Sequence, residues 1–337
     1  MLKRVILVLL PLALTLCIAC YLAWQSLQQT PLLLNDELFT VPAGSSAAKL
    51  CSQWQQQGKL SQTQCVLLRA YFKLNPDAAA VQQGLYRLGS ERTLLDVLAL
   101  FRSGRVAQFA ITFIEGETLQ QTLQRLNAAS YLQQDIDSAQ QVLSLLAWPA
   151  DWGPAPEHAE ALLYPDTYYY TADSHASALV KRAQQRLLAE LDQAWQQRQG
   201  DIPLQNRYQL LILASIIEKE SSYPPEKTLV ASVFVNRLRK NMRLQTDPTV
   251  IYGLQNFNGN ITWADLNNPH PYNTYRHHGL PPGPISLVSK ASLLAAAQPA
   301  DTQLYYFVSK GDGSHQFSST LQQHNAAVKK YILGSKP

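Results

Sequence analysis

The chain has 337 residues, enough for two domains of ordinary size with a hydrophobic core in each. Its formal net charge is only +4, from 28 basic and 24 acidic side chains, and its Lys and Arg residues form no block. A nucleic-acid partner is therefore not expected. His277 and His278 are adjacent, and neither is followed at three or four residues by another ligand type, so the pattern predicts no zinc site.

An unbroken apolar segment of twenty residues, 5–24, lies near the N-terminus and is long enough to cross a membrane as a helix. Two basic residues precede it, and none follows until Lys49, so the positive-inside rule keeps residues 1–4 in the cytoplasm and exports the rest. A cleaved signal peptide is the alternative, but its apolar region is usually shorter and ends in small residues. We expect an uncleaved anchor, followed by a polar stalk over 25–37.

Short strands and helices alternate over residues 38–115. Strands are expected at 38–41, 84–88 and 108–114, and helices at 46–57, 61–74 and 93–101, the first two of which begin on a capping Ser. Two of the four cysteines, Cys51 and Cys65, fall in the first two of these helices. An oxidising compartment allows them to form a disulfide, and two separate buried thiols are an equal alternative.

The strand pattern ends near residue 116, where we place a domain boundary. A capping box at 118–121 opens a helix over 119–128, and the chain to residue 197 is expected to be mostly helical. A Pro- and Gly-rich loop over 148–156 interrupts it. The second domain therefore spans 116–337.

The most informative segment is a run of apolar residues that is followed by two glutamates. Residues 210–217 are almost all Leu, Ile or Ala, which predicts a buried helix that carries Glu218 out of the core. A carboxyl group against apolar walls loses solvation as the anion, so we expect a raised pKa and a role as general acid for Glu218. Glu220 is on nearly the opposite side of the helix and is expected to form a salt bridge or face solvent. The alternative is that both are ordinary acids at a helix end.

Two polar loops supply candidate ligand-binding groups. Gln245, Thr246 and Asp247 precede a proline, which predicts an extended or turn conformation there. Asn273 and Tyr275 lie in a second loop, and amide, hydroxyl and aromatic groups of this kind line sugar-binding clefts. Hydrogen bonds that only fix the loops are the alternative.

Longer motifs connect these candidates. They are found at Tyr164–Tyr168, Val230–Leu238, Met242–Gly253, Pro271–Tyr275, Gly279–Ile285, Tyr306–Phe317 and His324–Asn325. In these residues the sequence resembles the YceG-like family of membrane-anchored endolytic murein transglycosylases, over nearly the whole chain. Two features depart from the family pattern: Ala161 follows Glu160 where Gly is usual, and 287–289 replaces a Pro-Gly turn.

The resemblance implies an α+β protein with a single transmembrane helix, a small LysM-like subdomain over 38–115 and a mixed α+β catalytic domain over 116–337. It implies Glu218 as the catalytic acid/base, with Gln245, Thr246, Asp247, Asn273 and Tyr275 as substrate-binding residues and no cofactor. The implied activity is cleavage of the MurNAc-GlcNAc bond of nascent glycan strands to 1,6-anhydro ends, beside the peptidoglycan synthases. The implied place is the inner membrane, with the catalytic domain in the periplasm.

Two other functions remain open from the sequence. The first is a muramidase, a hydrolase that would use Glu218 with Asp247 and water. The second is a scaffold without catalytic activity that binds glycan through the LysM-like subdomain. Both share the peptidoglycan ligand, so only the chemistry distinguishes them from a transglycosylase.

Overall fold

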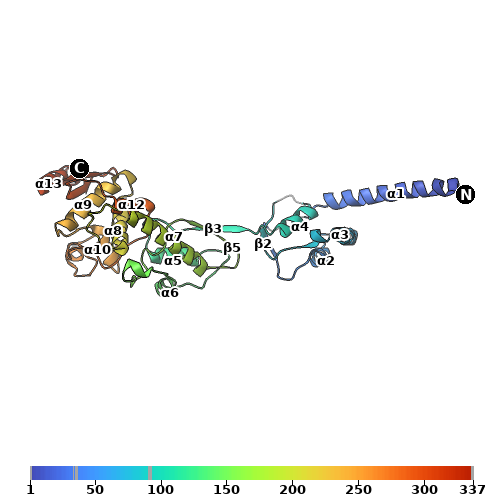
Figure 1. Cartoon of the computed structure of the whole chain (residues 1–337), viewed down its shortest axis with the longest axis horizontal. Helices are drawn as coiled ribbons and strands as arrows, with labels where there is room; N and C mark the ends of the chain where they lie inside the picture. Colours follow the sequence, from blue (N-terminus) through green and yellow to red (C-terminus); the bar gives the residue numbers. More distant parts are fainter. Residues whose placement is uncertain (1, 33, 35–36, 90–92, 335–337) are drawn as a thin grey trace. The chain divides into compact units, whose positions relative to one another are not determined.

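The computed structural model describes residues 2–32, 34, 37–89 and 93–334, and it divides into two compact units (Figure 1). The first unit comprises Met1–Phe109 with Tyr170–Ala172, and the second comprises Ala110–Tyr169 with Asp173–Pro337. Helices and strands occur in both units, so the predicted mixed α+β class is confirmed. The predicted domain limits at 38, 115 and 116 remain predictions.

The first helix, α1 (Leu2–Gln29), runs through Pro11 without ending there. Its part from Pro11 to Gln29 is long and apolar enough to cross a membrane, judged by length and composition. The helix extends past the predicted span into the predicted stalk, where Leu27 is buried. The end of α1 therefore belongs to the core of the first unit.

The remaining elements of the first unit follow the sequence prediction closely. They are β1 (Leu38–Val41), α2 (Ala47–Gln56), α3 (Gln62–Leu74), a 3₁₀ turn (Pro76–Ala79), β2 (Gly84–Arg87) and α4 (Leu94–Ser103). The two strands pair antiparallel, with Phe39 opposite Tyr86. Ser46 and Ser61 cap α2 and α3 as predicted, Thr93 caps α4, and Trp54, Tyr86 and Phe101 are fully buried between the helices.

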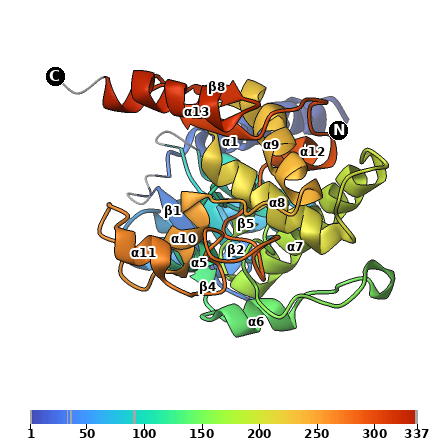
Figure 2. The same ribbon diagram turned by 90° about the vertical axis from the view of Figure 1, so that its left-hand side faces the viewer.

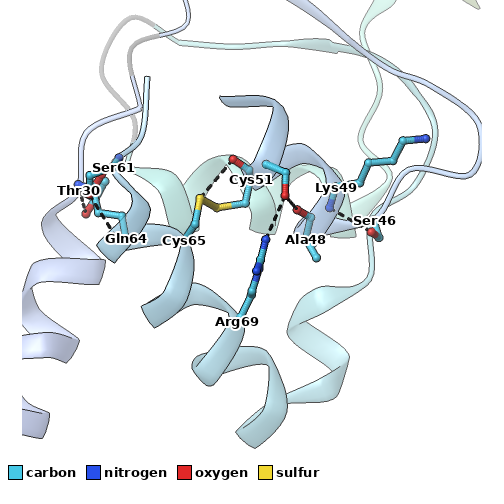
Figure 3. Close-up of a disulfide and its surroundings, with 10 residues drawn as sticks. Thr30, Ser46, Ala48, Lys49, Cys51, Ser61, Gln64, Cys65 and Arg69 are labelled. Carbon is cyan, nitrogen blue, oxygen red and sulfur yellow. Dashed lines mark hydrogen bonds between the residues drawn. A yellow bond between two sulfur atoms is a disulfide. The ribbon is translucent and has the colours of Figure 1, made fainter. Parts of the chain in front are cut away.

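Cys51 of α2 and Cys65 of α3 form a disulfide (Figure 3). Their Cα atoms lie 5.9 Å apart and both residues are buried. Arg69 donates a hydrogen bond to Ser52 beside this bridge at 3.1 Å. Of the two alternatives that the sequence left open, the structure has the bonded one.

The second unit is mainly helical. Its helices are α5 (Leu119–Asn127), α6 (Ala139–Ser144), α7 (Ala176–Gln196), α8 (Arg207–Glu220), α9 (Lys227–Arg239), α10 (Asp247–Gly253), α11 (Trp263–Asn267), α12 (Lys290–Ala297) and α13 (Leu321–Val328), with short 3₁₀ turns at Ala150–Trp152 and Pro224–Glu226 and a π turn at Lys329–Leu333. Helix α8 packs against α7, α9 and α12 (Figure 2). Its residues Leu210–Ile217 are all buried, as the apolar run predicts.

Three small sheets accompany these helices. Strand β3 (Gln108–Thr112) pairs with β5 (Thr167–Thr171), β4 (Leu132–Gln133) pairs parallel with β6 (Ser174–His175), and β7 (Tyr306–Ser309) pairs antiparallel with β8 (His315–Ser318). The division between the units passes through β3 and β5. Along β5, Tyr168 and Tyr170 are buried while Tyr169 is exposed, so the three tyrosines alternate between core and surface.

Two local predictions are wrong. The stretch between α5 and α7 is not mostly helical, because turns and short strands fill it and α6 is its single α-helix among the described residues. Asp247 is not in an extended or turn segment but is the first residue of α10, because a proline is well tolerated in the first turn of a helix. Ala161 has a φ of +61°, a conformation that glycine adopts without strain, which matches the Gly of the family pattern.

Candidate functional site

The last turn of α8 presents its two glutamates to two different cavities. Glu220 lines a cavity of about 390 Å³, which we call the Glu220 cavity. Glu218 lines a separate cavity of about 660 Å³, the Glu218 cavity. Residues two positions apart on a helix point in nearly opposite directions, so one turn serves both.

The Glu220 cavity combines acidic, amide and aromatic side chains. Its lining residues are Glu220, Arg237, Leu244, Gln245, Asp247, Tyr275, Tyr306, Phe307, Leu321 and His324. Three of the predicted substrate-binding residues are thus together, namely Gln245, Asp247 and Tyr275. They accompany Glu220, however, and Glu218 is not among them.

The carboxyl group of Glu220 has the properties expected of a proton donor. Burial raises its pKa to about 7, and the negative charge of Asp247 adds to this, although a hydrogen bond from Thr246 and the nearby His315 act in the opposite direction. Thr246 Oγ1 donates the hydrogen bond to Glu220 Oε1. A carboxyl group with this pKa is largely protonated below pH 7, and its protonated fraction falls tenfold for each pH unit above it.

The two predicted loops are joined by hydrogen bonds beneath this cavity. Thr246 is buried, and its backbone N–H donates to Thr274 Oγ1 at 3.1 Å. The Tyr275 hydroxyl donates to Asp247 Oδ1 at 2.6 Å. Arg237 Nη1 donates to the Leu244 carbonyl at 2.9 Å and to Gln245 Oε1 at 3.2 Å, which fixes the first loop against α9.

Asn273 has a different place from the other predicted binding residues. It is buried and does not line the Glu220 cavity. Its amide nitrogen donates to three backbone carbonyls, and its Oδ1 accepts from the backbone N–H of Tyr275 at 2.9 Å. For this residue the loop-fixing alternative describes the geometry.

One side of the Glu220 cavity was not predicted from the sequence. His324 of α13 lines it, and its ring stacks on Tyr306 of β7 with 5.2 Å between centroids. Burial lowers the pKa of His324, and the charge of Arg237 lowers it further. In the sequence, the His324–Asn325 motif was the one signal that pointed to this residue. His315 instead contacts Glu226, with 2.8 Å between Nδ1 and Oε2.

The side chain of Glu218 is only 7% exposed, in line with the prediction, but its pKa is not raised. Burial by itself would raise it, yet hydrogen bonds from Lys227, Ser289 and Ser292 outweigh that effect and hold the pKa below its ordinary value. Lys227 Nζ lies 2.9 Å from Oε1, and the Ser289 backbone N–H donates to Oε2 at 2.9 Å. The expected pKa was wrong because these partners come from α9 and from the residue before α12. Asp247 lines the other cavity, so the pair Glu218 and Asp247 is not brought together.

Known proteins resemble this chain over most of its length. The endolytic murein transglycosylase of Bacillus subtilis is 29% identical over 312 residues, which cover 87% of this chain and 84% of the relative. The protein of the same name from Streptococcus pneumoniae serotype 2 is 25% identical over 324 residues, and there the chain spans 58% of the relative's length. A yceG-like protein of Listeria monocytogenes has a crystal structure that aligns with a TM-score of 0.54 at 28% identity and covers 86% of this chain and 98% of its own.

A model of the YceG-like family matches residues 39–330, which takes in both polar loops and the last turn of α8. Since the match extends over far more than half of the sequence, the resemblance read from the motifs is confirmed, and the chain belongs to the YceG-like family.

Proposed function

We propose that this protein is a membrane-anchored endolytic murein transglycosylase in which Glu220 is the acid/base. The observation that carries the proposal is a carboxyl group with a pKa of about 7 in a cavity lined by amide, hydroxyl and aromatic groups. The names of the relatives support murein as the substrate. Gln245, Asp247 and Tyr275 are the substrate-binding residues, and Thr246 orients Glu220 from behind.

One acid is sufficient for this reaction. Glu220 donates its proton to the glycosidic oxygen as the bond from C1 of the MurNAc residue to that oxygen breaks. The resulting carboxylate then takes the proton of the C6 hydroxyl of the same MurNAc, and the C6 oxygen bonds to C1 to close a 1,6-anhydro ring. The proton balance of Glu220 is restored, and water is not consumed.

A second function is favoured by one observation. Glu220 and Asp247 line the same cavity, and a muramidase requires two carboxyl groups across the scissile bond. In that reaction water attacks C1, and the product keeps a reducing MurNAc end. The hydroxyl of Tyr275 engages Asp247 at 2.6 Å, which favours a binding role for this carboxylate over a catalytic one.

Product analysis tests the choice between these reactions. Digestion of uncrosslinked glycan strands by the full-length protein should give fragments with an anhydro-MurNAc end, lighter by one water than the hydrolytic products. Mass spectrometry of the fragments measures this directly. Reducing MurNAc ends would establish the muramidase, and intact strands would leave a glycan-binding scaffold.

The anchor sets where this chemistry takes place. We propose that α1 crosses the inner membrane once, with a cytoplasmic N-terminus and a periplasmic catalytic unit, because basic residues precede the apolar span and none follows until Lys49. Cleavage there would act on nascent strands beside the peptidoglycan synthases and end their elongation.

The C-terminus should therefore lie outside the cytoplasm, so that a reporter fused after Pro337 is active only if its own folding or activity requires the periplasm. An alkaline phosphatase fusion should be active and a fluorescent fusion that matures only in the cytoplasm should be dark. Recovery of a soluble mature protein that lacks its N-terminal residues would show that the segment is a cleaved signal peptide.

A further inference from the structure

The carboxylate of Glu218 belongs to a buried network that joins three helices. The carboxylate of Glu218 forms an ion pair with Lys227 of α9. The two side chains are only 7% and 5% exposed, respectively. Ser289 donates to Glu218 Oε2 through both its backbone N–H and its hydroxyl. Lys227 Nζ also donates to Ser292 Oγ of α12 at 2.8 Å. Both oxygens of Glu218 are thus engaged by donors.

This network is poorly suited to proton transfer and well suited to holding a helix end. An ionised carboxylate that already accepts several hydrogen bonds gives up no proton near neutral pH. A buried ion pair also adds little net stability, because desolvation offsets the attraction. What the contacts do specify is the direction in which the last turn of α8 points.

That turn needs external contacts. The last carbonyl groups of a helix lack partners within the helix, and α8 ends at Glu220 with the extended residue Ser221 and without a glycine cap. Glu220 itself is hydrogen-bonded to Thr246. The contacts of Glu218 with Lys227 and Ser289, which we call the Glu218 network, hold the opposite side of the same helical turn, two residues earlier in the chain.

We propose that Glu218 is a positioning residue: its contacts with Lys227 and Ser289 fix the last turn of α8 and thereby hold Glu220 inside the Glu220 cavity. The inference rests on the proposed function, in which Glu220 is the proton donor. Loss of the network would let the turn fray, so that Glu220 would become exposed to water.

The pH dependence of cleavage reports this exposure. The charged or titratable side chains around Glu220 are Asp247 of α10, Arg237 of α9, Tyr306 of β7, His315 of β8, His324 of α13 and Tyr275. The Glu218 network contributes none of them. A shift of the alkaline limb that is shared by Glu218→Gln and by the charge-balanced double variant Glu218→Gln with Lys227→Met therefore reports solvation of Glu220.

The experiment measures kcat and KM against pH for the full-length protein and for Glu218→Gln, on uncrosslinked glycan strands. The wild-type rate should fall above about pH 7. In Glu218→Gln the midpoint of that fall should move down by about one pH unit, toward the ordinary range of a solvated carboxyl, and kcat should fall roughly tenfold while KM changes little. The double variant Glu218→Gln with Lys227→Met removes both charges of the ion pair, and the same measurement is made on it in case the single variant does not fold.

A matched control lies at the other end of the same helix. Arg207, the first residue of α8, pairs with Asp192 of α7 at 2.6 Å. Arg207→Gln should lower the melting temperature and leave the pH midpoint in place. If Glu218→Gln and the double variant behave like this control, with lower stability and an unmoved midpoint, the positioning role is excluded.

Lys227→Met separates this inference from a failure of the proposed function. If Glu218 were itself the proton donor, loss of the cation beside it would raise its pKa and move the alkaline limb to higher pH. If Glu218 positions Glu220, the limb moves to lower pH. A shift to higher pH, together with normal cleavage by Glu220→Gln, would reject Glu220 as the acid, whereas an unmoved limb rejects only the positioning role.

Discussion

Glu220→Gln should lower kcat for glycan cleavage by about 10²–10⁴-fold, the usual contribution of a general acid. The amide keeps the shape of the side chain and can still accept the hydrogen bond from Thr246, but it carries no transferable proton. The variant should fold. Rates from mass spectrometry of the released fragments measure the effect.

Stability gives an independent check on the same variant. The pKa of Glu220 is raised in the folded protein, so its contribution to stability is complete below pH 4.5 and is lost as the pH rises through about 7. Glu220→Gln should therefore gain stability relative to the wild type as the pH increases over this interval. Equal pH profiles of melting temperature would contradict the raised pKa.

Glu218→Gln is the matched control, two residues away in the same turn. It removes a carboxylate that is already ionised and leaves Lys227 without its partner, so it should lose stability yet keep measurable cleavage. The sequence-based prediction has the opposite order, with Glu218 as the acid. Normal cleavage by Glu220→Gln with none by Glu218→Gln would restore that assignment.

Removal of the Cys51–Cys65 disulfide should lower the free energy of unfolding of the first unit by about 3 kcal/mol, the value that chain entropy gives for a loop of this length. Changing both residues to Ser should accelerate hydrogen exchange in α2 and α3 by roughly a hundredfold when exchange occurs through unfolding of that unit. Mass spectrometry of peptides from the two helices measures the protection.

The two cysteines of the anchor provide the control. Cys17 and Cys20 are free and exposed in α1, and their replacement by Ser should leave exchange in α2 and α3 unchanged. Thiol labelling of the denatured, unreduced wild type should reach these two and neither Cys51 nor Cys65. Labelling at all four positions would show that the bridge does not form.

Local signals predicted most of the fold. Helices α2 and α3 begin on the caps Ser46 and Ser61, as predicted, because a cap and its helix are neighbours in the chain. The hairpin of β7 and β8 turns at Gly311, Asp312 and Gly313, which is a local signal of the same kind. The prediction of mostly helical structure failed between α5 and α7, where the chain forms turns and short strands instead.

The candidate site was predicted less completely because its determinants are not local. An apolar run marks a buried helix end, but it does not tell which of two nearby acids loses its charge. That depends on Lys227 and Ser289, which stabilise the anion of Glu218, and on the absence of a cation paired with Glu220 among the described salt bridges. His324 joins the cavity from α13, more than a hundred residues beyond Glu220.

The division of labour between the two acids also has a consequence for the helix that carries them. The C-terminus of an α-helix bears a partial negative charge, so two carboxylates in the last turn of α8 would both be repelled by it. Below about pH 7 only one negative charge is present there, and the ammonium of Lys227 compensates it. The negative end of the helix dipole therefore acts in the same direction as burial in the cavity. It makes ionisation of Glu220 still less favourable, so the proton stays on the residue that has to donate it.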